Sequence, residues 1–332
     1  MANEIEKLNT IAITNIEKFN TFSDSDIEKI NGFEFTGVAL KTGIMGFGNG
    51  DAGRVGITNL ISNVGVVGSD VSAVGSARNE TAATEYGTGT AIFAFGTTYS
   101  AGSVATSNLV NSSGVVASDT SGVGEARGLL AAAAYGTDKG IFAYGESGSS
   151  GIVSLSNLVS NSGVVASDTS GVGTARASLC ATEYGSDTAI FALGYIGSSP
   201  YYLGMSNLVN NSGVIASDTS AVATGRYLPS GVKYSTDKGI LLQGIAASTD
   251  GYNTNKVSNS GVVASDVGGV GTARYGSGAC EYGSGKGIVA YGHTGIVQSA
   301  ISNLVSDSGV VAADVTGVGT ARHRMGAANT GG

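Results

Sequence analysis

The chain repeats one stretch six times, and the best preserved copy reads Asn157-Leu158-Val159-Ser160-Asn161-Ser162-Gly163-Val164-Val165-Ala166-Ser167-Asp168-Thr169-Ser170-Gly171-Val172-Gly173-Thr174-Ala175-Arg176. The aspartate of this block recurs every 48 to 50 residues, as Asp70, Asp119, Asp168, Asp218, Asp266 and Asp314. A unit of that length holds about four short strands with their turns, and fixed periods of about 40–50 residues are typical of β-propellers. The repeat therefore predicts an all-β fold, a six-bladed β-propeller.

Two of the three segments within each repeat keep a constant length. The asparagine of the block precedes its arginine by 19 residues in every copy, and 18 further residues lead from each of the first five arginines to a glycine that closes an apolar strand. The connection from that glycine to the next asparagine varies between 11 and 13 residues. The varying connections predict one face of variable loops on a rigid ring, the place where recognition residues concentrate.

The two ends of the repeat region complete each other. Residues 323–332 match the strand that follows Arg127 but lack the next strand, and residues 41–48 match that next strand but lack the one before it. Joining the ends makes six whole blades and leaves no unpaired terminal edge. We therefore expect residues 38–332 to form one propeller, in which the N- and C-terminal strands share a blade.

Residues 1–37 carry a different repeat, Ile-Glu-Lys-X-Asn, with a period of 11 residues. Apolar pairs at i and i+3 line one helix face, and an 11-residue period supports a helical stripe. Because Asn20 and Asn31 resemble helix stops, we expect a leader of short helical turns. It either docks on another protein or packs over the bottom of its own propeller. The anchoring pairs are Ile5/Leu8, Ile16/Phe19 and Ile27/Ile30.

Composition narrows the function classes. The net charge of −8 argues against nucleic acid or an anionic membrane as a partner. No apolar run approaches the roughly 18 residues of a spanning helix, and the acidic N-terminus lacks the apolar region of a signal peptide. We expect synthesis in the cytoplasm without membrane insertion. Cys180 and Cys280 fall in blades that are not adjacent, so we expect two free thiols.

The sequence lacks a catalytic constellation. His293 and His323 are the only histidines, which excludes a histidine-rich metal site and gives a Ser/His/Asp triad little support. Glu85, Glu183 and Glu281 each precede a blade tyrosine and recur with the repeat, which indicates a solvated strand face. We therefore expect a protein that is not an enzyme and has no cofactor or metal.

An aspartate and an arginine eight residues apart recur in all six copies. A sixfold group indicates architecture, because a catalytic site needs to occur once; we expect a pair that braces each blade or caps a turn. The alternative, a ring of calcium sites, meets the difficulty that each copy offers one carboxylate where calcium prefers several oxygens. The pairs are Asp70/Arg78, Asp119/Arg127, Asp168/Arg176, Asp218/Arg226, Asp266/Arg274 and Asp314/Arg322.

The variable loops carry the predicted binding residues. The longest, residues 195–205, holds three tyrosines, a proline and a methionine. Tyrosine combines a large contact area with a polar tip and is favoured at interfaces. Alternatively, this loop covers a hydrophobic gap or contacts a neighbouring subunit. The predicted loop-face residues are Tyr195, Tyr201, Tyr202, Met205, Tyr99, Tyr252 and His293.

Nearly the whole chain resembles repeat proteins of tailed bacteriophages, especially those of cyanophages and other marine phages. The resemblance rests on the block at residues 163–176, the strand at residues 139–145 and the Ile-Glu-Lys-X-Asn leader. It implies a virion structural protein of the head decoration, collar, tail or fibre, which binds other capsid or tail proteins through residues 1–37. The repeat length is kelch-like, but the kelch signatures are absent. The alternative is a module that binds a host-surface glycan or protein through the loop face.

Overall fold

The structure, a computed structural model, describes residues 40–72, 75–220, 223–246 and 253–331, together with residues 7–8, 11–12, 18–19, 22–23, 29–30 and 33–34. These residues are all-β, as the repeat predicts, and include no helix. Among them there is consequently no helix with the length and apolarity needed to cross a membrane. The chain divides into two units, Met1–Leu40 with Gly332 and Lys41–Gly331.

The described residues of the leader form β-hairpins, so the predicted helical turns are wrong there. The paired strands are Lys7–Leu8 (β1) with Ile11–Ala12 (β2), Lys18–Phe19 (β3) with Phe22–Ser23 (β4), and Lys29–Ile30 (β5) with Phe33–Glu34 (β6). Two residues separate the strands of each pair, and the first is asparagine each time. Asparagine favours two-residue hairpin connections because it tolerates positive φ.

The 11-residue period of the leader is therefore a period of hairpins. Of the predicted anchor residues, Leu8, Phe19 and Ile30 lie in these strands. Ile5, Ile16 and Ile27 lie outside the described residues.

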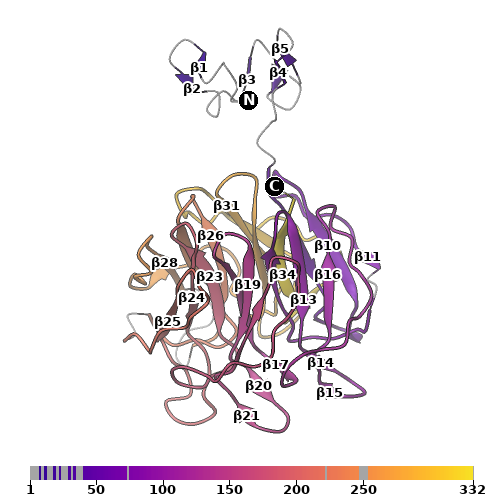
Figure 1. Cartoon of the computed structure of the whole chain (residues 1–332), viewed down its shortest axis with the longest axis vertical. Coiled ribbons are helices and arrows are strands. Elements are labelled where there is room, and N and C mark those ends of the chain that lie inside the picture. Colours follow the sequence, from indigo (N-terminus) through magenta and orange to yellow (C-terminus); the bar gives the residue numbers. More distant parts are fainter. Residues whose placement is uncertain are drawn as a thin grey trace. The chain divides into compact units, whose positions relative to one another are not determined.

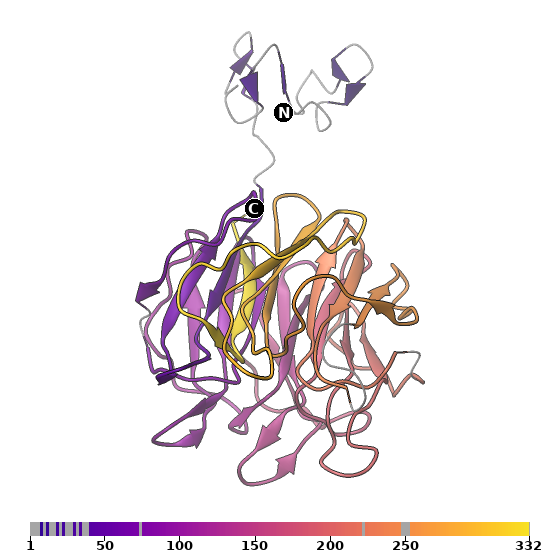
Figure 2. The ribbon, with the colours of Figure 1, turned by 180° about the vertical axis from the view of Figure 1, so that it is seen from behind.

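The described residues of the second unit form six principal antiparallel sheets (Figures 1 and 2). Each is formed by one repeat, except that sheet 1 combines strands from the two ends of the repeat region. Sheet 1 contains β34 (Gly326–Thr330), β7 (Thr42–Gly46), β10 (Ile57–Ile61) and β11 (Val71–Ser72). Sheet 2 contains β12 (Ala82–Tyr86), β13 (Thr90–Ala94) and β16 (Ser107–Val110), and sheet 3 contains β18 (Ala131–Tyr135), β19 (Lys139–Ala143) and β22 (Ser156–Val159). Sheet 4 contains β23 (Cys180–Tyr184), β24 (Thr188–Ala192) and β25 (Ser206–Val209). Sheet 5 contains β26 (Ser230–Tyr234), β27 (Lys238–Leu242), β28 (Asn253–Val257) and β29 (Val267–Gly268), and sheet 6 contains β30 (Gly278–Tyr282), β31 (Lys286–Ala290) and β32 (Ser302–Val305).

The predicted pairing of the two ends of the repeat region is confirmed. β34 pairs with β7 in register from Gly326↔Gly46 to Thr330↔Thr42. The Thr42 hydroxyl also donates to the Thr330 carbonyl at 2.6 Å. Sheet 1 is therefore completed by a strand from the far end of the chain, so that β7 is paired on both sides, with β10 and with β34.

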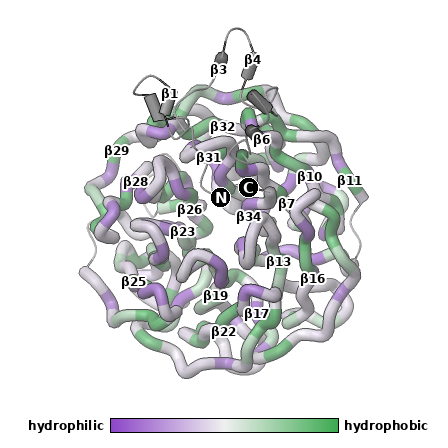
Figure 3. Tube along the Cα trace, turned by 45° about the horizontal axis from the view of Figure 1, so that its top comes forward, coloured by the Kyte–Doolittle hydropathy of each residue, from purple (hydrophilic) through white to green (hydrophobic). Residues whose placement is uncertain are grey.

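An apolar core lies between each two neighbouring sheets, and one of these cores joins sheet 6 to sheet 1. Between sheets 3 and 4 the core includes Ala131, Ala133, Ala181, Ile141 and Phe191, so small residues from the first strands meet larger ones from the second. Middle strands such as β19 are buried on both faces, as their continuous apolar sequence predicts. Figure 3 shows the sheets following one another around a common centre.

The two cysteines belong to these cores. Cys180 in sheet 4 and Cys280 in sheet 6 are free and buried. Burial raises the pKa of the Cys180 thiol to about 12, so it stays protonated at neutral pH.

Six backbone hydrogen bonds close a ring around the centre. The second residue after each repeat arginine donates its N–H to the carbonyl of its counterpart in the preceding repeat, at 2.7 to 3.2 Å. All six residues have positive φ, which turns their amides toward the neighbouring repeats. We call this set the axial ring: Glu80, Leu129, Ser178, Leu228, Gly276 and Arg324.

The six repeat arginines are buried at the junctions between sheets, with at most 1% of their surface exposed. Arg127 donates from Nε to the Tyr144 carbonyl at 2.8 Å and from Nη2 to Asn157 Oδ1 at 2.6 Å. Its guanidinium stacks over the Phe95 ring of the preceding sheet at 4.3 Å. Burial lowers the pKa of Arg127 to about 10, so the side chain remains charged at neutral pH.

The predicted pairing of each arginine with the aspartate eight residues before it is wrong. Each arginine lies beside the aspartate of the next repeat, because the residues between aspartate and arginine cross to the next sheet. Arg127 Nη1 lies 3.7 Å from Asp168 Oδ1, for example. The corresponding ion pairs are Arg78–Asp119, Arg226–Asp266 and Arg274–Asp314. Hydrogen bonds from Thr174 and Thr320, and from the repeat asparagines, lower the carboxyl pKa of Asp218 and Asp70. The positive charges of Arg176 and Arg322 lower these two pKa values further, by a smaller amount.

Replacing Arg127 with methionine is expected to lower the free energy of unfolding by about 3–5 kcal/mol, because Asp168 and the Asn157 and Tyr144 oxygens lose their buried donor. Chemical denaturation measures this loss. Lys139→Met in the same repeat is the control: Lys139 is 43% exposed and pairs with Asp138, so the change should stay within about 0.5 kcal/mol. Equal losses of unfolding free energy in the two variants would contradict the role of Arg127 in holding neighbouring sheets together.

Candidate functional site

The described parts of the variable connections lie at one end of the sheets. Each begins by pairing with the residue that follows a repeat arginine, as in Ala177↔Tyr195 and Tyr275↔His293. We call this end of the sheets the loop face. Short strands shape three connections: β8 (Asn49–Gly50) with β9 (Gly53–Arg54), β14 (Thr97–Thr98) with β15 (Gly102–Ser103), and β20 (Glu146–Ser147) with β21 (Gly151–Ile152). β33 (Arg322–His323) pairs with β8, and β17 (Arg127–Gly128) with β20.

Three predicted tyrosines converge on the loop face. The Tyr195 ring stacks with Tyr201 at 6.4 Å, lies 6.1 Å from Tyr202 and meets the edge of Tyr227 at 5.8 Å. Tyr201 is 51% exposed. We call these four residues the tyrosine cluster. Tyr227 was missed in the sequence, although it stands directly after a repeat arginine, where three other repeats have Asn79, Gly128 or Ala177.

The other predicted loop residues do not join this cluster. Tyr99 is 74% exposed and stacks on the Arg54 guanidinium at 4.4 Å. His293 lies 5.2 Å from the Tyr275 ring and 5.3 Å from the His323 ring. Met205 is half-buried at the base of its loop, where its carbonyl accepts from the Leu193 amide at 2.9 Å. Tyr252 lies outside the described residues.

Arg324 connects the tyrosine cluster to the axial ring. Its Nη2 donates to the Tyr227 hydroxyl at 3.0 Å, and its Nη1 pairs with Glu80 Oε1 at 2.7 Å. Burial raises the pKa of Tyr227. Burial, together with the charge of Arg324, lowers the pKa of His323 to about 4, so this imidazole is neutral at pH 7. This part of the loop face therefore offers aromatic rings and one paired cation.

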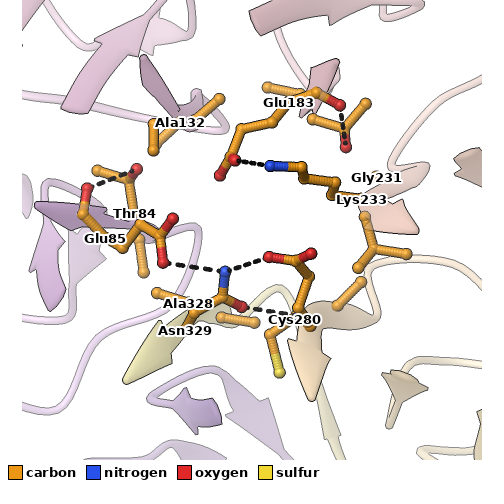
Figure 4. Close-up of a pocket in the computed structure, with 18 residues that line it drawn as sticks. Thr84, Glu85, Ala132, Glu183, Gly231, Lys233, Cys280, Ala328 and Asn329 are labelled. Carbon is orange, nitrogen blue, oxygen red and sulfur yellow. Dashed lines mark hydrogen bonds and ion pairs between the residues drawn. The ribbon is translucent and has the colours of Figure 1, made fainter. Parts of the chain in front are cut away.

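A second group of polar residues lies on the axis, between the first strands of the sheets (Figure 4). Glu85, Glu183 and Glu281 come from sheets 2, 4 and 6, and their interpretation as a solvated strand face is wrong. They line a central cavity of about 430 Å³, where the Glu281 side chain is 5% exposed. The equivalent positions of sheets 1, 3 and 5 hold Asn329, Ala134 and Lys233. We call these six residues, with Lys41, the axial charge cluster.

Lysines separate some of these carboxylates. Lys41 Nζ lies 2.7 Å from Glu281 Oε2 and 3.3 Å from Glu85 Oε1, and Lys233 Nζ lies 3.1 Å from Glu183 Oε2. Asn329 Nδ2 donates to both Glu85 and Glu281 at 3.1 Å. Burial works against the charge of Lys41, but its three glutamate neighbours outweigh burial and raise its pKa.

The alternation of carboxylate and cation is interrupted at sheet 3. Ala134 stands between the strands that carry Glu85 and Glu183, where the equivalent residue of sheet 5 is Lys233. Burial, followed by repulsion from Glu85, raises the pKa of Glu183 to about 7. The cluster therefore contains one carboxyl group that titrates near neutral pH.

Lys41, the first residue of the second unit, lies at the end of the sheets opposite the loop face. The Lys41 amide donates to the Gly283 carbonyl at 3.1 Å, and the Gly283 amide donates back at 2.8 Å. Gly283 lies in the turn between β30 and β31, whereas the variable connection leaves from the other end of β31. Residue 41 and the variable loops thus lie at opposite ends of the sheets.

The described residues contain no group of three or more His, Cys, Asp or Glu side chains that could hold a metal ion. The alternative of a calcium ring also has no support, because amide and hydroxyl donors occupy the carboxylates. Asp218, for instance, accepts from Asn207 Nδ2 at 2.9 Å and from the Thr174 hydroxyl at 2.7 Å.

The raised pKa of Glu183 predicts that its contribution to stability falls as the pH rises. An unfolded glutamate releases its proton near pH 4.3, so between about pH 4.5 and 7 the folded chain holds a proton that the unfolded chain has lost. Glu183→Gln removes this dependence. Relative to the wild type, the variant should therefore gain on the order of 1–3 kcal/mol between pH 5 and pH 8, measured by urea denaturation.

Ala134→Lys is the matched variant for this test. It places a cation at the interrupted position and should lower the pKa of Glu183, which reduces the loss of stability between pH 5 and pH 8. If neither variant altered the wild-type pH dependence, Glu183 would not be its source.

Comparison with known proteins gives no family for this chain: no protein-family model matches it, and no curated protein matches it. The geometry of the loop face and of the axis therefore carries the functional argument.

Proposed function

We propose that this chain is a non-enzymatic structural component of a bacteriophage virion. In this proposal, residues 41–331 form a six-bladed β-propeller with one repeat per blade, and residues 1–37 attach it to other capsid or tail proteins. The protein is made in the host cytoplasm and located in the virion, as a head decoration, collar, tail or fibre component. The resemblance of the repeats and the leader to phage repeat proteins supports the virion assignment.

The observation that carries the proposal is the sixfold set of joints between sheets. Each junction combines an apolar core, a buried arginine and a bond of the axial ring, and the last junction returns from sheet 6 to sheet 1. Arg322 donates to the Phe47 carbonyl at 2.9 Å across that junction. A cycle of such joints favours a rigid body that projects or bridges.

The two ends of this body suit different tasks. The second unit begins at Lys41, which lies at the end of the sheets opposite the loop face. The tyrosine cluster favours a second function on that face, binding of a host-surface glycan or protein. Its rings offer apolar area with polar tips.

Deletion of residues 1–37 is expected to yield a folded protein that no longer enters particles, because the leader belongs to a unit separate from the repeats. Particle incorporation is measured by mass spectrometry of purified virions, and folding by the melting temperature. Normal incorporation of the deleted protein would contradict attachment through the leader. A lowered melting temperature would instead indicate that the leader packs on its own propeller.

Particles that carry Tyr201→Ala with Tyr202→Ala are expected to adsorb to host cells at least tenfold more slowly, without a change in melting temperature. The matched control is Tyr99→Ala, which removes an exposed loop-face tyrosine outside the tyrosine cluster. Unchanged adsorption of particles with the double variant would contradict the receptor-binding function. Equal slowing by Tyr99→Ala would remove the assignment to this cluster.

A further inference from the structure

A cavity of about 390 Å³ lies on the axis directly against the axial ring. The ring residues and the residue that follows each of them form its walls, so it belongs to the loop-face end and is distinct from the cavity of the axial charge cluster.

Burial raises the pKa of the Tyr227 phenol, and the Ser178 side chain lies close enough to lower it in part. Even so, three polar atoms in the walls of this cavity make no hydrogen bond of ordinary distance and angle within the protein. They are Thr81 Oγ1, Ser178 Oγ and Arg324 Nε, and they make up three of the four such buried atoms in the described part of the chain. Ser178 is 1% exposed and Thr81 5% exposed. Buried polar groups in proteins are almost always hydrogen-bonded, so three unpaired groups around one cavity point to a bound polar molecule.

The repeat does not require these polar groups. At the position of Ser178 two other repeats have Leu129 and Leu228, and at the position of Thr81 two others have Leu130 and Leu179. Neither position keeps one residue type through the six repeats, so the fold accepts both apolar and polar side chains there. Ser277, at the position of Thr81 in another repeat, serves as the contrast: its hydroxyl can donate either to Gln243 Oε1 at 2.9 Å or to the Tyr291 carbonyl at 3.0 Å.

Charge and apolar lining define the class of ligand. Arg324 is paired with Glu80 at 2.7 Å, so the walls carry no net charge, and either an anion or a cation would face one repelling group. The remaining walls include Leu129, Leu228 and Met325. The hydroxyl groups of a ligand can both donate to and accept from the hydroxyls of Ser178 and Thr81. The C–H groups of the same ligand can pack on Leu129 and Leu228.

We propose that this axial cavity is a binding subsite for a neutral polyhydroxylated group the size of one sugar unit. The Thr81 and Ser178 hydroxyls and Arg324 Nε hydrogen-bond the ligand. Tyr227, which accepts from Arg324, joins the subsite to the tyrosine cluster. This inference rests on the receptor-binding function of the loop face and names the chemical class that the face recognises.

The test titrates the full-length protein with a panel of neutral monosaccharides, glucose, galactose, mannose and N-acetylglucosamine, by ligand-observed NMR. At least one sugar should bind the wild type. Ser178→Ala and Thr81→Val should each weaken that binding at least tenfold and leave the melting temperature unchanged or raised, because each removes an unpaired hydroxyl.

Ser277→Ala is the matched control. Its hydroxyl is already paired within the protein, so this variant should lose thermal stability, in contrast to Ser178→Ala and Thr81→Val. Two results would overturn the subsite: no sugar of the panel binding the wild type, or binding that Ser178→Ala and Thr81→Val leave intact. A lowered melting temperature of Ser178→Ala would also overturn it, since the hydroxyl would then be satisfied by structural water.

Host adsorption separates the two proposals. If adsorption still depends on Tyr201 and Tyr202 while no sugar binds, the loop face recognises something else and only the subsite fails. If adsorption does not depend on these tyrosines while sugar binding depends on Ser178, the receptor-binding assignment fails and the cavity stands as a site.

Discussion

The guanidinium buried between two sheets is the interaction on which the rest of the fold depends. The sheets meet through many alanines and glycines, which bury little apolar area per residue. Each junction therefore also depends on a side chain that contacts both neighbouring sheets. An arginine does so because its planar fork donates in several directions while its face stacks on an aromatic ring. Arg78, Arg127, Arg176 and Arg322 stack on a ring of the preceding sheet and donate to carbonyls of the following one.

This arrangement explains the constant spacing of the block. A buried guanidinium is stable only when its hydrogen bonds are satisfied, and its partners come from a neighbouring repeat. The distances from asparagine to arginine, and from arginine to the strand-closing glycine, therefore cannot change without breaking a junction. Length varies in the connections of the loop face, which take no part in the arginine contacts.

Departures from the repeat mark the candidate sites. The axial charge cluster exists because six equivalent positions hold glutamate, alanine, lysine and asparagine instead of one residue type. The hydroxyls of Thr81 and Ser178 also stand at positions that vary among the six repeats. The tyrosine cluster combines the longest loop with Tyr227 of the next repeat. Each site uses residues from several sheets, which only a ring of repeats brings together.

The sequence by itself determined the all-β class, the six repeats, the pairing of the two ends of the repeat region and the single face of variable loops, because repeat spacing reports strand and turn lengths directly. It also pointed to Tyr195, Tyr201 and Tyr202. Tertiary structure decided which aspartate each arginine meets, that Glu85, Glu183 and Glu281 converge on one axis, and that the leader pairs as hairpins. These features depend on the path of the chain between sheets or on hydrogen bonds between strands, and the spacing of a repeat does not distinguish one path or pairing from another. A period of 11 residues suits a hairpin as well as a helical stripe, and the pairing of backbone groups decides between them.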